Sequence, residues 1–306
     1  MLNTIMFLLL IAFISPTTPT SPPSTGSLPP TNNQQQPVIL KPNRINKNPS
    51  SHFRPAVESD LPALTTIIVE AFSPSGTWNY LMPDQAHHKK EIWSCMHDQL
   101  VQGWKQFNRE KTFLNVITVP LGEDSHNDHD EEEKEEREEE TPVALAFWNM
   151  RSQQDASSSL PFAESPFTTN TFYSLLRTCS TVPGTNLTRA HDFDRQMQPV
   201  FQKYFFTDYP QQLYLNLLAT HPDWDGNGFA ARHVRWGMEL SRGRDGKMEI
   251  GGQGVGEAKT IPVTLLSSPA GWPVYEELGF EGVENATVAM LDGLGKLWFE
   301  VSKWDG

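Results

Sequence analysis

Apolar side chains recur at helical spacing in two stretches of the N-terminal half of the chain. The first stretch follows Glu58-Ser59-Asp60, a polar segment typical of a helix start, and contains Leu61, Leu64, Ile67, Ile68, Ala71 and Phe72. The second runs from about Ala86 to Phe107, with an apolar side chain every four residues at Ile92, Met96, Leu100 and Trp104. A spacing of three to four residues places these side chains on one face, so we expect two amphipathic helices.

Two runs rich in β-forming residues follow, Thr112–Val119 and Pro142–Met150, and a strongly acidic stretch separates them. Together they predict a β-hairpin with an oversized connecting loop. Residues 123–140 hold twelve acidic and two basic side chains, so of the formal net charge of -13 only about -3 belongs to the rest of the chain. We interpret residues 122–141 as a solvated acidic insertion.

The C-terminal half predicts a strand, a turn and a helix in immediate succession, after a helical stretch at Asp192–Phe206. Leu213–Thr220 is an almost wholly apolar run of strand length, as expected of a central strand that is covered on both faces. The segment 221–228 is rich in Gly, Pro, Asp and Asn and must be a turn, and Phe229–Ser241 returns to helical spacing. A further strand is expected at Ile261–Ser267.

The N-terminal 50 residues differ in composition from the rest. Residues 5–14 are continuously apolar, which is too short to span a bilayer, and residues 16–50 are rich in Pro, Ser and Thr. We therefore divide the chain into an apolar segment with a disordered linker at 1–50 and one domain at 51–306. The apolar run fits a secretory signal, although no Lys or Arg precedes it, and an N-terminal anchor or a gene-model artefact are the alternatives. Membrane contact is expected only through residues 5–14.

Charge and cysteine content narrow the functional classes. The chain is acidic and has no basic stripe, so no nucleic-acid partner is expected. Cys95 and Cys179 lie far apart without a CxxC pattern, which excludes a disulfide scaffold and a cysteine-based zinc site and makes a reducing compartment the default. We accordingly expect a cytoplasmic protein, with the secretory pathway or a membrane anchor as the alternative. The oligomeric state is left open.

A strand that passes through a glycine turn into a helix aims free backbone N–H groups and the positive end of the helix dipole at one spot, which suits a pyrophosphate. Here the turn reads Asp225-Gly226-Asn227-Gly228-Phe229-Ala230. Downstream stand Ser268-Pro269-Ala270-Gly271 and Val274-Tyr275-Glu276-Glu277-Leu278-Gly279-Phe280. In both motifs and their order, the chain resembles the GCN5-related N-acetyltransferase (GNAT) superfamily, in particular the compact fungal kind, over about residues 52–290.

The resemblance implies an α/β acyltransferase fold with a mixed, mostly antiparallel central sheet and flanking helices. It further implies an enzyme that transfers an acetyl group from acetyl-CoA, as co-substrate and without a metal, to a small-molecule or peptide amine by direct attack in a ternary complex. The pantetheine arm would lie along Leu218, Ala219 and Thr220. The phosphates would meet the loop and the first helical turn, namely Asp225, Gly226, Asn227, Gly228, Phe229, Ala230 and Ala231. Tyr275 would protonate the departing thiolate, its alternative role being that of a packed core tyrosine.

Two departures from the family pattern leave a second function open. Asp225 stands where the family has Gln or Arg, and an acid there repels phosphate unless Asp225 or Asn227 caps the helix, which is the interpretation we favour. No general base is evident. His221 fits a turn residue better than a base, and Tyr214, Asn216 and Thr220 share one side of a regular strand and could order a water. The alternative is a catalytically inactive GNAT-fold protein that binds acyl-CoA or another protein.

Three further patterns are set aside. The run Gly251–Gly256 resembles a dinucleotide fingerprint but has no room for a helix before the next strand, so we interpret residues 243–258 as a glycine-rich insertion. His87, His88 and His97 lack metal-ligand spacing and are interpreted as helix-surface histidines. Asn186 and Asn285 each begin a glycosylation sequon, which matters only if the chain is exported.

Overall fold

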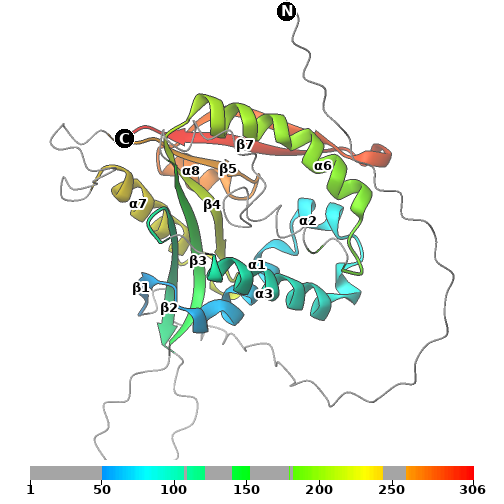
Figure 1. The fold of residues 1–306 in the computed structure, drawn as a ribbon, viewed down its shortest axis with the longest axis horizontal. Coiled ribbons are helices and arrows are strands. Elements are labelled where there is room, and N and C mark those ends of the chain that lie inside the picture. The colour runs from blue at the N-terminus through cyan, green and yellow to red at the C-terminus, as the bar shows by residue number, and fades with distance from the viewer. Residues whose placement is uncertain (1–49, 107–108, 121–139, 152–178, 180–181, 244–259) are drawn as a thin grey trace, which may run out of the picture. The chain divides into compact units, whose positions relative to one another are not determined.

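The computed structural model describes residues 50–106, 109–120, 140–151, 179, 182–243 and 260–306 (Figure 1). They all lie within one compact unit, Gln36–Gly306. The predicted N-terminal linker, the glycine-rich run and nearly all of the acidic insertion lie outside the described residues.

In the described part of the chain, seven strands form one sheet in the order β1-β2-β3-β4-β5-β7-β6. The strands are β1 (His52–Pro55), β2 (Thr112–Pro120), β3 (Glu140–Arg151), β4 (Gln212–Thr220), β5 (Val263–Ser267), β6 (Glu281–Ala289) and β7 (Lys296–Trp304). Every neighbouring pair is antiparallel except β4 and β5, which run parallel. The prediction of a mixed, mostly antiparallel sheet with flanking helices is therefore confirmed.

Helices cover both faces of this sheet. The α-helices are α1 (Leu61–Phe72), α2 (Gly76–Leu81), α3 (Lys89–Lys105), α6 (Leu187–Val200), α7 (Phe229–Ser241) and α8 (Trp272–Glu277); short 3-10 segments are η1 (Glu58–Asp60), η2 (Gln85–His87), η5 (Pro222–Trp224) and η7 (Leu291–Gly293). One core cluster joins α1, α3 and α6 to the sheet, and a second joins α7 and α8 to the opposite face. None of the described helices is long and apolar enough to cross a membrane.

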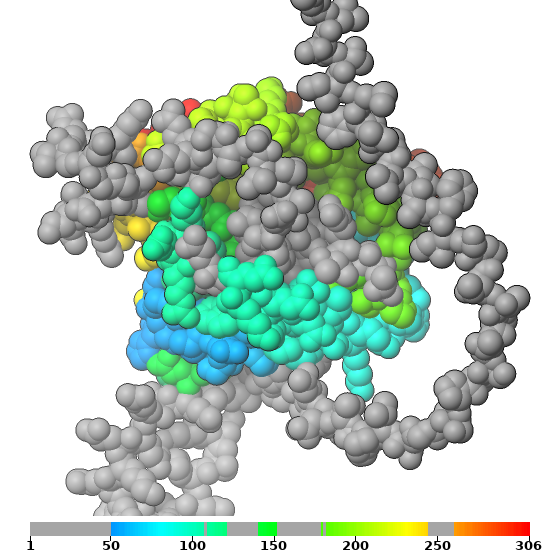
Figure 2. Space-filling view, in the orientation of Figure 1, coloured from blue at the N-terminus to red at the C-terminus, as the bar shows by residue number. Residues whose placement is uncertain are grey.

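Most predicted elements are present with bounds close to those expected. Helix α7 matches its prediction residue for residue, and α1 and α3 begin and end within a few residues of theirs. The stretch expected as one helix at 192–206 instead starts at Leu187, contains Pro199 and continues after Val200 as a π-helix, η4 (Phe201–Asp208). Figure 2 shows α3 lying across one face of the molecule, with α6 above it.

The end of the acidic insertion belongs to the sheet, so its predicted boundary at 141 is two residues too late. Glu140 and Thr141 begin β3, opposite Pro120 and Val119 of β2. Thr118 Oγ1 donates a 2.6 Å hydrogen bond to Glu140 Oε2, and His52 Nδ1 bonds the other carboxylate oxygen. The hydrogen bond from Thr118 lowers the pKa of Glu140. This carboxylate therefore ties the edge of the sheet together.

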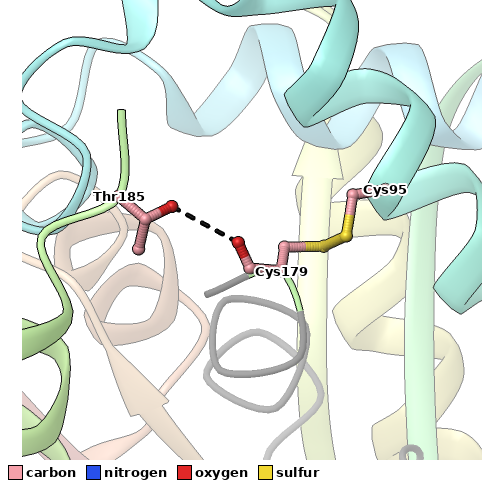
Figure 3. Close-up of a disulfide and its surroundings, with 3 residues drawn as sticks. All are labelled: Cys95, Cys179 and Thr185. Carbon is pink, nitrogen blue, oxygen red and sulfur yellow. Dashed lines mark hydrogen bonds between the residues drawn. A yellow bond between two sulfur atoms is a disulfide. The ribbon is translucent and has the colours of Figure 1, made fainter. Parts of the chain in front are cut away.

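The two cysteines form a disulfide, a pairing that the sequence analysis did not predict. Cys95 projects from α3 and bonds Cys179, 84 residues later, with their Cα atoms 5.8 Å apart (Figure 3). Cys179 is completely buried, and its carbonyl oxygen accepts hydrogen bonds from Val182 N at 3.0 Å and from Thr185 Oγ1 at 3.4 Å. Sequence spacing did not reveal this pair because the cysteines meet only through the fold.

Candidate active site at the ends of the parallel strands

Strand β4 contains a β-bulge at Asn216. Leu215 pairs with Trp148 of β3 and Leu217 pairs with Phe147, so one extra residue stands on the β4 side. In a regular strand, residues two apart share a face. Here Leu215 packs in the core beneath α7, whereas Leu217 packs in the core beneath α1. The bulge thus reverses the faces of β4, and Tyr214, Asn216 and Thr220 do not share one side as the sequence predicted.

The parallel neighbour β5 pairs with β4 only along the first part of β4. The register joins Leu213, Tyr214 and Leu215 to Val263, Thr264 and Leu265, whereas β4 continues to Thr220. Among the described residues, the stretch 217–220 has β3 as a strand partner on one side and no strand partner on the side of β5. Leu218, Ala219 and Thr220 therefore present a free strand edge toward the gap between the two parallel strands.

The turn after β4 is fixed by its own polar side chains. His221 is 8% exposed, its N–H bonds Val143 O of β3, and its Nδ1 accepts a 3.2 Å hydrogen bond from Asp223 N. His221 therefore caps η5, as the turn interpretation predicted. Asn227 Nδ2 donates to Trp224 O at 2.9 Å and braces the far side of the turn.

Two glycines carry the turn into α7 in the left-handed conformation. Gly226 has φ 80° and Gly228 has φ 73°, values that residues with a Cβ adopt only under strain. No heavy atom lies within 4 Å of the position that a Cβ would take on either glycine. The turn therefore faces open space instead of packing against the protein.

The start of α7 leaves backbone donors available. Gly228 is the N-cap residue and offers no side-chain hydrogen bond, and the first helical bond runs from Arg232 N to Gly228 O at 3.0 Å. The N–H groups of the first turn, at Phe229, Ala230 and Ala231, thus precede the helical ladder. Phe229 itself is buried with its ring against Trp224, which anchors the helix end beneath these donors.

The predicted capping role of Asp225 or Asn227 is wrong. The cap position of α7 belongs to Gly228, Asn227 bonds Trp224, and Asp225 follows η5 with an exposed side chain. Partial burial raises the pKa of Asp225, although the neighbouring His221 lowers it. The carboxylate consequently stands beside the open glycine turn without a capping function.

The turn after β5 is packed, in contrast. Gly271 N donates to Ser268 O at 3.0 Å, and a Cβ on Gly271 would come within 3.2 Å of Ser267 Oγ and 3.3 Å of Tyr275 Cε2. This turn leads into α8, whose residue Tyr275 is 8% exposed and meets Phe280 edge-on at 5.8 Å between ring centroids. The carboxyl ends of parallel strands meet at one sheet edge, so the structure brings the two sequence motifs together.

Tyr275, which is buried, and Tyr214, which is half-buried, both have shifted pKa values that sequence reasoning did not predict. Burial raises the pKa of each above the usual range, and the charge that Tyr275 would carry raises that of Tyr214 further. Both phenols therefore stay protonated well above neutral pH.

Each of the three histidines that the sequence analysis considered as a metal ligand contacts an acidic or an aromatic side chain. Among the described residues, no group of three or more His, Cys, Asp or Glu side chains is arranged to hold a metal ion. His87 Nδ1 lies 2.5 Å from Asp84 Oδ1, and His88 Nε2 lies 3.4 Å from Asp84 Oδ2. His97 instead stacks on Trp93 at 5.0 Å and is partly buried, which lowers its pKa.

No protein-family model and no curated protein matches this chain. Among solved structures, it is similar to a histone acetyltransferase HPA2 and related acetyltransferase from Corynebacterium glutamicum, with 15% identity, 84% of this chain and 96% of that chain covered, and a TM-score of 0.44. It is also similar to mosquito arylalkylamine N-acetyltransferase like 5b, with 12% identity, 83% and 100% coverage and a TM-score of 0.41. For Arabidopsis thaliana NAA60 in complex with a bisubstrate analogue, the identity is 10%, the coverage 83% and 96%, and the TM-score 0.38. Because these scores are low, the function of this chain has to be argued from its own residues.

Proposed function

We propose that this protein is an acetyl-CoA-dependent N-acetyltransferase of the GNAT type, with its cofactor site at the end of β4. One observation carries the proposal. Strand β4 parts from its parallel neighbour, bulges at Asn216 and enters an uncapped helix through two left-handed glycines that face open space. This combination provides a free strand edge and a cluster of backbone donors for one elongated, anionic ligand.

The glycine turn and the first turn of α7 suit the pyrophosphate of acetyl-CoA. Backbone N–H groups at a helix N-terminus bind anions through hydrogen bonds and the helix dipole. The donors run from Gly226 to Ala231, and only glycine at 226 and 228 keeps side-chain atoms out of the space above them. Asp225 opposes binding by like-charge repulsion, which solvent screens because the carboxylate is exposed.

The free edge of β4 suits the pantetheine arm, which carries two amides. An extended ligand with amide groups can pair with an unpaired strand edge as an added strand would. Leu218, Ala219 and Thr220 offer this edge between the bulge and the glycine turn. A CoA molecule held at both places would direct its thioester toward Asn216.

The chemistry then requires a polarised carbonyl and a proton for sulfur. The amine nitrogen attacks the thioester carbon, the C–S bond breaks, and the thiolate takes a proton while the new amide loses one. Backbone N–H groups released from the ladder by the bulge are candidates to stabilise the oxyanion. Tyr275 is the candidate proton donor, since its buried phenol is protonated at neutral pH.

A second function is favoured by a specific observation. Tyr275 of α8 lies in the core cluster that joins α7 and α8 to the sheet, and His221 is occupied as a cap. A protein that binds acyl-CoA without transferring the acyl group fits these facts as well. Turnover separates the two functions: acetyl-CoA binding without acetylation of any small-molecule or peptide amine in a broad panel would favour the inactive protein.

The binding half of the proposal is tested by a thermal shift with acetyl-CoA. At about 100 times Kd, a ligand that binds only the folded state stabilises it by about 2.7 kcal/mol. Gly228→Glu should abolish the shift, because it places a charged side chain where phosphate would lie. Gly293→Glu is the matched control, since Gly293 also has a positive φ of 69° and open space around it but lies in the β6–β7 turn.

The two variants should lose similar stability from backbone strain, and only Gly228→Glu should lose the acetyl-CoA response. Equal responses in the two variants would refute the assignment of the glycine turn. An acceptor screen by mass spectrometry, carried out with the wild-type protein, then identifies the amine.

A further inference from the structure

The disulfide and one of the two sequons give information about where this chain matures. Disulfides form and persist in oxidising compartments and are rare in the cytosol, where thiols are kept reduced. The Cys95–Cys179 bond ties α3 to a residue with no exposed surface in the principal core (Figure 3). Its formation transfers two electrons and two protons from the thiols to a thiol–disulfide oxidant, which such compartments supply.

The second sequon, Asn285-Ala286-Thr287, lies on β6, the last strand of the sheet. Asn285 and Thr287 are exposed, whereas Ala286 between them is 4% exposed and faces the core. Because side chains alternate along a strand, the two sequon residues that matter for glycosylation share the outer face. Asn285 Nδ2 makes one exposed hydrogen bond, 3.2 Å to Glu300 Oε2 of β7. A glycan on Nδ2 would replace that exposed hydrogen bond and would disturb no contact in the core.

The first sequon occupies a different environment. Asn186 is the N-cap residue of α6, where its Oδ1 accepts a 3.1 Å hydrogen bond from Arg189 N. Its backbone N–H also bonds Leu81 O at 2.8 Å, and the residue is half-buried. Asn186 is thus part of the packing between α2 and α6, which makes it the natural internal comparison for Asn285.

We propose that this chain matures in an oxidising, glycosylating compartment and carries an N-linked glycan on Asn285. The donor is a lipid-pyrophosphate-linked oligosaccharide. Asn285 Nδ2 forms a bond to C1 of the first sugar and gives up a proton, while the bond from C1 to phosphate breaks and the lipid pyrophosphate leaves. This proposal selects the secretory alternative over the cytoplasm, and the apolar residues 5–14 are the sequence feature suited to direct such entry.

The test uses the full chain, tagged at its C-terminus and expressed in yeast, with gel mobility compared before and after treatment with a peptide N-glycosidase. The wild-type protein should shift, and enzymatic deglycosylation should convert Asn285 to Asp, as read by peptide mass spectrometry. Thr287→Ala should abolish the shift, and Thr287→Ser, which keeps the sequon, should retain it. Asn186→Gln should leave the shift unchanged.

A wild-type protein without glycan, or with glycan only on Asn186, overturns the proposal. Maleimide labelling under denaturing conditions tests the disulfide in the same material: we expect no labelling before reduction, and free thiols at Cys95 and Cys179 would overturn the oxidising compartment. Acetyl-CoA binding is measured separately on this protein. Its failure bears only on the proposed acetyltransferase activity, because neither Asn285 nor the disulfide belongs to the glycine turn.

Discussion

The turns that follow the two parallel strands differ in whether protein atoms fill the space beside their glycines. The turn after β4 has two left-handed glycines whose missing side chains would meet no atom, whereas a side chain on Gly271 after β5 would press against Ser267 and Tyr275. Both turns contain glycine and both lead into a helix. In the first, glycine keeps space open beside backbone donors; in the second, it allows the chain to pack closely around a tyrosine.

This difference assigns separate tasks to two turns that both contain glycine and both precede a helix. An open turn at a helix N-terminus can bind a ligand through the backbone, so it tolerates variation in its side chains as long as the glycines stay. A packed turn cannot bind anything itself, but it orients the side chain that follows it. We therefore expect mutations at the first turn to change affinity and mutations after the second to change turnover.

The largest effect expected on turnover is that of Tyr275→Phe. Loss of the phenol should lower kcat by roughly ten- to a hundredfold, at the low end for a general acid because a thiolate is a fair leaving group. The affinity for acetyl-CoA should stay within about threefold, since the proton is needed mainly in the transition state. The fold should persist, because Phe keeps the ring contact with Phe280.

Steady-state kinetics with an amine from the acceptor screen, together with Tyr214→Phe as the matched control, would check this. Because burial raises the pKa of Tyr275, the wild-type kcat should show no decline from its deprotonation between pH 6 and 9. Turnover at the wild-type rate across that range would mean that Tyr275 only packs. If only Tyr214→Phe lowered kcat, Tyr214 would be the proton donor instead of Tyr275.

A smaller effect is expected from Asp225→Asn at the open turn. Removing the exposed carboxylate should tighten acetyl-CoA binding about two- to threefold at low ionic strength, because one like charge no longer opposes the phosphates. The Debye length falls to about 3 Å at 1 M salt, so the difference should vanish there. Calorimetric titrations at both salt concentrations measure this; weaker binding by the variant would show that the carboxylate helps to hold the ligand.

The smallest effect is expected from deleting the acidic segment. Removal of 123–139 spares Glu140, which bonds Thr118, and should leave the thermal midpoint and the acetyl-CoA affinity nearly unchanged, since shortening a long surface loop changes its closure entropy little. Deletion of 123–140 also removes Glu140 and should be the less stable of the two variants. Thermal melts of both deletions distinguish the effect of the Glu140 carboxylate from that of the rest of the loop. Equal stability of the two variants would contradict the proposed role of Glu140 in the sheet.

The elements around β4 could be predicted because local sequence and tertiary environment agree there. Leu213–Thr220 is almost wholly apolar and is covered on both faces, and the glycines mark the turn without ambiguity. Strands β6 and β7 were not predicted. In β6 most side chains are exposed and only Ala286 and Val288 are buried, so the hydrophobic alternation is too weak to indicate a strand.

The residues proposed for the candidate site come from sequence motifs, whereas its geometry could not be predicted from them. The bulge at Asn216 depends on register with β3, and the gap beside β4 depends on where β5 turns away. The disulfide between α3 and Cys179 likewise joins residues far apart in the chain. No local pattern of residue types encodes such contacts.

The position of β6 has a consequence for the behaviour of the protein at high concentration. Within the described residues, this nine-residue strand pairs with β7 on one side and has no strand partner on the other. Such an edge offers a template on which another chain can add a strand, the first step of edge-to-edge aggregation. Glu281 and Glu284 place negative charge along it, and a hydrated glycan on Asn285 would shield its middle. The sugar would then act as a solubility device, keeping copies of the protein apart in a crowded compartment.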